Sequence, residues 1–364
     1  MKNNTVKLIA YYLPQFHTIP ENDKWWGEGF TEWTNVKNAH PLFEGHEQPV
    51  EPGELGYYDL NNPEVRQKQA QLAERYGLYG FCYWHYWFGN GSTLLDMPFN
   101  EILRTGKPDY PFCLGWANES WTGIWHGAPD RMLIEQKYPG KEDVLRHFEY
   151  ILPAFEDPRY IKIANKPFFL IYKPDNHPDL KRFTDVFHNL SIKYGFDGIH
   201  FVATNVSESW PLNEYGFSAI APSYHNGIIW QKPRSWIKRT KKIFQSKNRE
   251  IVNDIRHLYS YREARDYFLP FSKNKEFIYP TVVPNWDNSP RVGKRAVILH
   301  NSTPELYREH LEETVKYVQN NDTDNKIILL KSWNEWAEGN YIEPDKKWNR
   351  AYLEVTKSVL DEFA

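Results

Sequence analysis

The chain contains 364 residues, 41% of them hydrophobic and 25% charged, and carries a formal net charge of −3 at pH 7. This composition is typical of a soluble globular protein, and with its weak negative charge the chain as a whole carries no electrostatic footprint for nucleic acid. Two cysteines without metal-ligand spacing argue against a disulfide framework or a zinc site, and no apolar run is long enough to span a membrane. The N-terminus also lacks a secretory signal, so we expect a cytoplasmic location.

Short apolar runs rich in β-branched and aromatic residues recur along the chain and are typical of buried strands. In chain order these runs are VKLIAYYL from Val6, GLYGFCYW from Gly77, FCLGWA from Phe112, PFFLIYK from Pro167, IHFVATN from Ile199, FSAIAPS from Phe217, FIYPTVV from Phe277 and KIILLKSW from Lys326. Helix-like patterns separate most of them. Residues 62–77 are the clearest, with Asn62 as a cap, Pro63 in the first position and Gly77 at the end. Three others cover residues 142–155, 179–195 and 303–321.

Eight strands alternating with helices predict an α/β protein, built as a single (β/α)8 TIM barrel over residues 1–364. The alternative is an open doubly wound sheet, which often carries a glycine-rich nucleotide-binding loop. Neither Gly-x-Gly-x-x-Gly nor Gly-x-x-x-x-Gly-Lys-Ser/Thr follows any of the runs, so the barrel is favoured.

Two long insertions interrupt the barrel pattern, after the first and the sixth strands. Residues 15–62 contain six Trp or Phe residues, which favour an ordered and functional segment. Residues 226–262 contain eight Lys or Arg between Lys232 and Arg249, which we interpret as a solvated charged face. The alternative is weak contact of residues 232–249 with a membrane surface or a lipid-pyrophosphate carrier.

The ends of the eight runs are rich in Trp and Tyr next to amide, imidazole or carboxylate side chains. Active sites of barrels lie at these strand ends. Sugars present C–H faces that stack on aromatic rings and hydroxyls that need polar partners, so we predict a site for an oligosaccharide or polysaccharide. The candidate substrate-binding residues are Tyr12, Gln15, His17, Trp84, His85, Trp87, Trp116, Asn118, Glu119, Trp121, Tyr224, His225, Trp286, Asp287, Trp333, Asn334 and Trp336.

Glu335 and Glu338 are the candidate catalytic pair, because glycosidic chemistry commonly uses one carboxylic acid and one carboxylate. They share a face if the chain turns helical after the last strand, and point to opposite faces if the strand continues. Close carboxyl groups would favour retention of configuration and push their pKa values apart. Glu343, next to Pro344, is expected to support the site rather than react.

Other chemistries remain as alternatives. Glu119 is a rival acid, although we favour a role in binding hydroxyl groups, and Glu32 is either structural or reaches the site from the first insertion. A metal site would require His17, His85 and His225 to converge, but no metal-ligand spacing supports it, so we expect no metal and no cofactor.

Five sequence blocks together resemble a known family. They are AYYLPQFHTIPENDKWWGEGFTEWTNV, LFEGHEQPVEPGELGYYDL, GFCYWHYWF, LGWANESWT and WNEWAEGNYIEP, and they extend from about Leu8 to Pro344. They resemble the WbsX-type glycosyltransferases, also described as glycoside hydrolase family 99-like proteins. The resemblance implies a (β/α)8 barrel and a role in bacterial surface polysaccharide metabolism, such as that of O-antigen or capsule.

The hydrolase relatives are retaining, endo-acting α-mannosidases with a Glu-Trp-x-Glu-Gly motif, which Glu335, Trp336, Glu338 and Gly339 match. The resemblance implies that Glu335 is the base that deprotonates the sugar 2-hydroxyl, giving a 1,2-anhydro sugar. It implies that Glu338 is the acid that protonates the leaving oxygen, and that neither a metal nor a nucleotide is needed. The two insertions depart from the hydrolases, so cleavage and transfer both remain open.

We therefore expect a retaining enzyme that cleaves or transfers an α-linked sugar of mannose or rhamnose type. One alternative is a glycosyltransferase of O-antigen or capsule biosynthesis, although no nucleotide-binding loop is present. A second alternative is a non-catalytic glycan-binding protein, which would be expected to have lost Glu335 or Glu338, and both are present.

Overall fold

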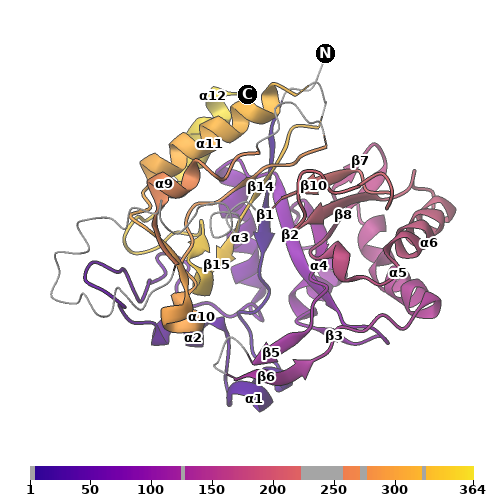
Figure 1. Ribbon diagram of the computed structural model, residues 1–364, viewed down its shortest axis with the longest axis horizontal. Helices are drawn as coiled ribbons and strands as arrows, with labels where there is room; N and C mark the ends of the chain where they lie inside the picture. The colour runs from indigo at the N-terminus through magenta and orange to yellow at the C-terminus, as the bar shows by residue number, and fades with distance from the viewer. Residues whose placement is uncertain (1–4, 124–127, 223–256, 271–276, 322–324) are drawn as a thin grey trace.

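The computed structural model of the chain describes residues 5–123, 128–222, 257–270, 277–321 and 325–364 (Figure 1). Its largest sheet is a parallel barrel whose strands pair in sequence order. They are β1 (Lys7–Tyr12), β2 (Gly80–Trp87), β4 (Phe112–Trp116), β8 (Lys166–Ile171), β9 (His200–Thr204), β10 (Ala219–Ala221), β12 (Thr281–Val282) and β14 (Ile327–Leu330). Each of the eight predicted runs contains one of these strands, so the predicted barrel is confirmed.

The barrel is nearly closed. Strand β14 pairs with both β1 and β12, and a parallel bridge joins Ile220 in β10 to Ile278 just before β12. The strand interiors are almost fully buried, as expected for parallel strands that helices cover on one face and core side chains fill on the other. The carboxyl ends of all eight strands therefore open toward the same end of the molecule.

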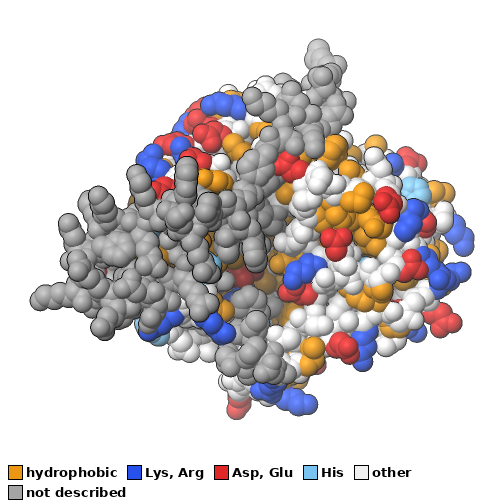
Figure 2. Space-filling view, viewed as in Figure 1, with side chains coloured by type: hydrophobic (Ala, Val, Ile, Leu, Met, Phe, Trp, Pro, Cys, Tyr) orange, Lys and Arg blue, Asp and Glu red, His pale blue; other side chains and the backbone are white. Residues whose placement is uncertain are grey.

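Helices α3 (Pro63–Arg75), α4 (Met97–Thr105), α5 (Lys141–Glu156), α6 (Leu180–Lys193), α11 (Pro304–Gln319) and α12 (Ala351–Glu362) accompany the barrel. Figure 1 shows α11 beside α12 on one side and α5 beside α6 on the other. The predicted cap is confirmed, because Asn62 accepts a hydrogen bond from the Glu64 amide at 2.9 Å. Thr303 caps α11 in a similar way and accepts a hydrogen bond from the Leu306 amide at 3.3 Å. Charged side chains of both signs are interspersed over the face shown in Figure 2.

The first insertion is ordered, as predicted. It contains α1 (Pro20–Trp26) and α2 (Glu32–Asn38), and the buried ring of Trp33 lies 4.6 Å from Phe16 and 5.5 Å from Trp336. The indole of Trp33 also donates to the Tyr58 carbonyl at 2.7 Å. These contacts hold the insertion against the end of the barrel that follows β14.

The basic stretch predicted between Lys232 and Arg249 lies outside the described residues. The chain is next described at β11 (His257–Ser260) and α9 (Tyr261–Arg265), and β11 pairs with β13 (Val297–His300) in a separate small sheet. Among the helices of the described ranges, none has the length and hydrophobicity needed to cross a bilayer.

Candidate active site

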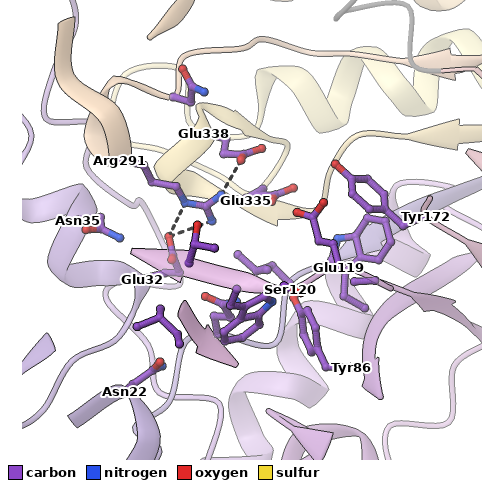
Figure 3. Close-up of a pocket in the computed structure, with 18 of the residues that line it drawn as sticks. Asn22, Glu32, Asn35, Tyr86, Glu119, Ser120, Tyr172, Arg291, Glu335 and Glu338 are labelled. Carbon is purple, nitrogen blue, oxygen red and sulfur yellow. Dashed lines mark hydrogen bonds and ion pairs between the residues drawn. The ribbon is translucent and has the colours of Figure 1, made fainter. Parts of the chain in front are cut away.

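A pocket of about 490 Å³ lies at the carboxyl ends of the barrel strands (Figure 3). Side chains that end or follow β2, β4, β8, β12 and β14 form part of its wall. The first insertion closes the remaining side with α1, α2 and the chain around them. The insertion residues that line the pocket are Gln15, Asn22, Trp26, Phe30, Glu32 and Asn35.

Arg291 binds carboxylates from two distant parts of the chain at the edge of this pocket (Figure 3). The residue lies in the short helix α10 (Ser289–Val292). Its Nη1 is 2.5 Å from Glu338 Oε1 and 3.8 Å from Glu335 Oε1, while Nη2 is 3.1 Å from Glu32 Oε2. The four side chains are between 7% and 11% exposed, so these charges interact with little screening by water.

Glu335 and Glu338 reach the same pocket because the chain turns sharply between them. Strand β15 (Asn334–Glu335) is followed by a single 3-10 turn, η5 (Trp336–Glu338), and then by β16 (Asn340–Tyr341). Gly339 closes the turn at φ 64°, and a Cβ there would approach the Asp287 amide nitrogen at 2.8 Å. A side chain at position 339 would therefore be strained and would clash, which accounts for the glycine.

Two asparagines hold the backbone at the strand ends from which the glutamates project. Asn334 bonds the Leu13 amide and carbonyl at 2.7 and 3.0 Å, so it joins the end of β14 to the end of β1. Asn118 bonds the Lys173 amide and carbonyl at 2.8 and 2.7 Å, joining β4 to β8 in the same way. Both asparagines are completely buried. Each fixes the position of the glutamate that follows it.

Burial raises the pKa of Glu335 to about 7, and repulsion from Glu338 adds to the effect, while Lys331 and Arg291 oppose it. A second set of contacts links the two carboxylates on the side away from Arg291. Ser332 Oγ lies 3.0 Å from Glu335 Oε2 and 2.7 Å from Asn340 Oδ1, and the Asn340 amide donates to Glu338 Oε2 at 3.4 Å. The pair is thus held from both sides.

Aromatic rings form much of the remaining wall. Trp84 stacks on Tyr11 at 4.9 Å between ring centres and meets Tyr172 edge-on at 5.4 Å. Trp121 in β5 (Trp121–Gly123), which pairs with β6 (Ala128–Ile134), meets Tyr86 edge-on at 5.0 Å. These rings are fixed by one another, as a wall for a sugar ring requires.

Three charged side chains complete the polar part of the pocket. Glu119 forms an ion pair with Lys173 across the ends of β4 and β8. The Lys331 ammonium lies 4.6 Å from the ring centre of Trp286, in cation–π contact.

The structure brings seven of the candidate residues together in the pocket and places ten others away from it. The pocket contains Gln15, Trp84, Glu119, Trp121, Trp286, Glu335 and Glu338. The side chains buried elsewhere are Tyr12, His17, His85, Trp87, Trp116, Asn118, Asp287, Trp333, Asn334 and Trp336. Tyr224 and His225 lie outside the described residues.

Side-chain alternation explains several of these placements. Along β2, Trp84 and Tyr86 face the pocket, so His85 and Trp87 point to the opposite face, toward α5. His85 lies 2.9 Å from His147 between their Nε2 atoms, and the Trp87 indole donates to Asp143 at 3.1 Å. Burial lowers the pKa of His85 to about 4, so a neutral ring is favoured.

The remaining displaced residues support the fold around the pocket. Trp116 donates to the Trp87 carbonyl at 3.0 Å, Tyr12 donates to Gln69 at 2.7 Å, and Trp333 is fully buried. Trp336 donates to Glu343 at 2.6 Å, which gives Glu343 the supporting role expected for it.

The alternative metal site would require His17, His85 and His225, and His225 lies outside the described residues. His17 is buried with no hydrogen-bond partner for either ring nitrogen among the described residues. Over the described ranges, no group of three His, Cys, Asp or Glu side chains is arranged to hold a metal ion.

Three cations of the pocket, Lys173, Arg291 and Lys331, were not among the candidates from the sequence. Each has a signal that could have found it. Lys173 ends the fourth run, Arg291 follows the seventh run in a Ser-Pro-Arg sequence that starts a helix, and Lys331 lies near the end of the eighth run. The candidates were aromatic, amide, imidazole and acidic side chains, so they did not include the cations at the same strand ends.

The family described as Glycosyltransferase WbsX matches this sequence over residues 8–356. The chain belongs to that family. The resemblance found in the sequence blocks is thereby confirmed. Similar curated proteins are the uncharacterized protein WxcX of two Xanthomonas campestris pv. campestris strains, B100 and ATCC 33913, each 37% identical over 361 residues. The alignment covers 97% of this chain and 49% of WxcX, so the chain spans about half the length of these relatives.

Solved structures share the fold. The GH99 endo-alpha-mannosidase of Bacteroides thetaiotaomicron is 16% identical with a TM-score of 0.56, over 98% of this chain and 97% of that one. A protein described as glycoside hydrolase-like is 13% identical with a TM-score of 0.60, over 99% and 95% of the two chains. These similarities agree with the barrel described above.

Proposed function

We propose that this chain is a retaining enzyme that cleaves or transfers an α-linked sugar, of mannose or rhamnose type, in a bacterial polysaccharide. The observation that carries the proposal is the contact of Glu335 and Glu338 with one nitrogen of Arg291, at 3.8 and 2.5 Å. The two Oε1 atoms cannot be further apart than the sum of these distances. That sum is below the ~6.5 Å at which the range of inverting enzymes begins, which supports retention.

In the first step, Glu335 removes the proton from the sugar 2-hydroxyl. The freed oxygen attacks the anomeric carbon, the bond to the leaving oxygen breaks, and Glu338 gives that oxygen its proton. The pKa of Glu335, about 7, suits this base, because a general base works best when its pKa lies near the operating pH. The ion pair of Glu338 with Arg291 stabilises the carboxylate that remains after the proton is given up.

In the second step, Glu338 takes a proton from the incoming water or acceptor hydroxyl, whose oxygen attacks the anomeric carbon. The three-membered ring opens and Glu335 returns its proton to the 2-oxygen. Two successive attacks at the anomeric carbon leave its configuration as it was. With water the reaction is hydrolysis, and with a sugar hydroxyl it is transfer.

The pocket supports a carbohydrate substrate. Its volume of about 490 Å³ falls within the ~300–1,000 Å³ of ligand sites, and it combines aromatic walls with carboxylates and amides. The name of the Bacteroides thetaiotaomicron structure supports an α-mannoside as the first substrate to try.

Transfer from a sugar attached to a phosphate is the second candidate, and Lys331 favours it. This lysine lines the pocket near Glu335, and no carboxylate among the described residues is in ion-pair contact with it. A phosphate leaving group would give the ammonium an anionic partner. The description of the family as a glycosyltransferase agrees with this reading.

The test is to assay the wild-type protein with α-linked mannose and rhamnose oligosaccharides and, separately, with nucleotide sugars and an oligosaccharide acceptor. Glu335→Gln and Glu338→Gln should each abolish turnover while leaving glycan binding in place. Unchanged turnover in either variant would refute the assigned roles. Binding without turnover in the wild type would favour the non-catalytic glycan-binding alternative.

A further inference from the structure

A second cavity, of about 550 Å³, lies behind one wall of the candidate active site. The wall is the segment 285–288 after β12. Its side chains alternate: Trp286 and Asn288 line the active-site pocket, while Asn285 and Asp287 line the second cavity. The end of η5 divides in the same way: Glu338 lines the active-site pocket, and Gly339 lines the second cavity.

The wall is joined directly to the turn that carries Glu338. The Asp287 amide donates to the Glu338 carbonyl at 2.7 Å, and Gly339 leaves no room for a side chain against Asp287. On the cavity side, the Asp287 carboxylate lies 2.8 Å from His46 Nε2 and accepts from Gln48 at 2.7 Å. Burial opposes ionisation, but these hydrogen bonds hold the pKa of Asp287 below its usual value.

The cavity is lined by the side chains that bind neutral sugars well. Three rings face it: Tyr341, which stacks on Trp336 at 3.8 Å, together with Trp348 and Tyr352. Aromatic rings offer apolar faces to the C–H surface of a sugar. The amide side chains of Asn285 and Gln48 also line the cavity, and their carbonyl oxygens have no hydrogen-bond partner in the part of the chain that the structure describes.

The lysines that line the cavity do not favour an anionic ligand. Lys346 forms an ion pair with Glu51, and Lys347 forms one with Glu47. Each charge is therefore offset by a carboxylate of the first insertion. A neutral, hydroxyl-rich ligand fits this arrangement better than a phosphate does.

We propose that this cavity is a second carbohydrate-binding site, which holds a neutral sugar unit while the active-site pocket holds the reacting one. The inference rests on the proposed function only for the class of ligand. Two sites on one enzyme would raise its affinity for a polymer that reaches both, since the second contact is then intramolecular. A sugar bound in the second cavity would also contact the segment 285–288, which is hydrogen-bonded to the backbone of Glu338.

The test uses calorimetric titration of Glu338→Gln with a linear α-linked mannose tetrasaccharide and with a rhamnose tetrasaccharide, so that turnover does not disturb binding. We expect two binding steps for at least one of them, because ligand in excess fills the two sites with separate molecules. Trp348→Ala should weaken one step roughly tenfold or more and leave the other unchanged, the loss expected when a stacking contact is removed. Tyr194→Ala, which removes a ring that is 48% exposed at the end of α6, is the matched control and should change neither step.

Asn285→Ala is a second variant of the cavity, which distinguishes loss of the binding site from misfolding of Trp348→Ala. Its side-chain oxygen has no partner within the described residues, so the variant should unfold at the wild-type temperature and still lose the same binding step. A single binding step, two steps that both variants leave intact, or no binding of either tetrasaccharide would each overturn the proposal. If the wild type shows no turnover but the binding step that depends on Trp348 is observed, the result would count against the proposed function alone.

Discussion

Replacing Glu335 with glutamine should stabilise the folded protein at alkaline pH. Burial raises the pKa of this carboxyl from the ordinary 4.5 to about 7, so between these values the folded chain binds a proton that the unfolded chain has released. The stability of the wild type therefore falls as pH rises through this window. Glutamine cannot ionise and avoids the loss.

The size of the effect follows from the shift in pKa. Each unit corresponds to about 1.4 kcal/mol, so the shift of Glu335 amounts to about 3 kcal/mol once both states are ionised. The gain of Glu335→Gln over the wild type should be small near pH 4.5, rise between pH 4.5 and 7, and be constant above that. A gain of this sign is expected where a carboxylate is buried for catalysis rather than for stability.

The assay is urea unfolding followed by tryptophan fluorescence, at a series of pH values from roughly 5 to 9. Glu142→Gln, which removes an exposed carboxylate at the start of α5, is the control and should not give this alkaline gain. If Glu335→Gln is no more stable than the wild type at the alkaline end, or if its gain does not vary with pH, the electrostatic account of the pair is refuted.

Three further experiments test other parts of the structure. Arg291→Met leaves three buried carboxylates without their cation, and should cost about 3–5 kcal/mol in urea unfolding and abolish turnover; a cost below about 1 kcal/mol would contradict this. Gly56 and Gly339 have nearly equal φ angles of 62° and 64°, but only Gly339 meets neighbouring backbone. Thermal unfolding should therefore show Gly56→Ala destabilised by about 1–2 kcal/mol and Gly339→Ala by clearly more, whereas equal losses would rule out the clash. Asn334→Ala removes two buried hydrogen bonds to the end of β1 and should lower kcat more than it raises KM; a change in KM alone would argue against a positioning role.

The barrel could be predicted because its signals are local. Each strand is a short apolar run buried on both faces, and the caps at Asn62 and Thr303 depend on side chains one turn away. The order of the first insertion could be expected from its aromatic residues, since Trp33 has a large apolar surface to bury.

The site was predicted only in part, because the direction of a side chain depends on contacts that are distant in sequence. Trp87 and Trp336 were predicted to bind sugar, but alternation sends Trp87 to α5, and the turn after β14 buries Trp336 against the insertion. No local pattern shows that Glu32 and Glu338 share Arg291, because the two glutamates are 306 positions apart in the sequence. Asn334 was expected to bind sugar and instead holds the backbone of β1.

The central claim is that Glu335 and Glu338 act as a pair on a glycosidic bond and retain its configuration. Proton NMR of the first product released from an α-linked mannose oligosaccharide tests it most directly. We predict that the α-anomer appears first with the wild-type protein, and that Glu335→Gln and Glu338→Gln give no product. A β-anomer as the first product, or undiminished product from either variant, would contradict the account.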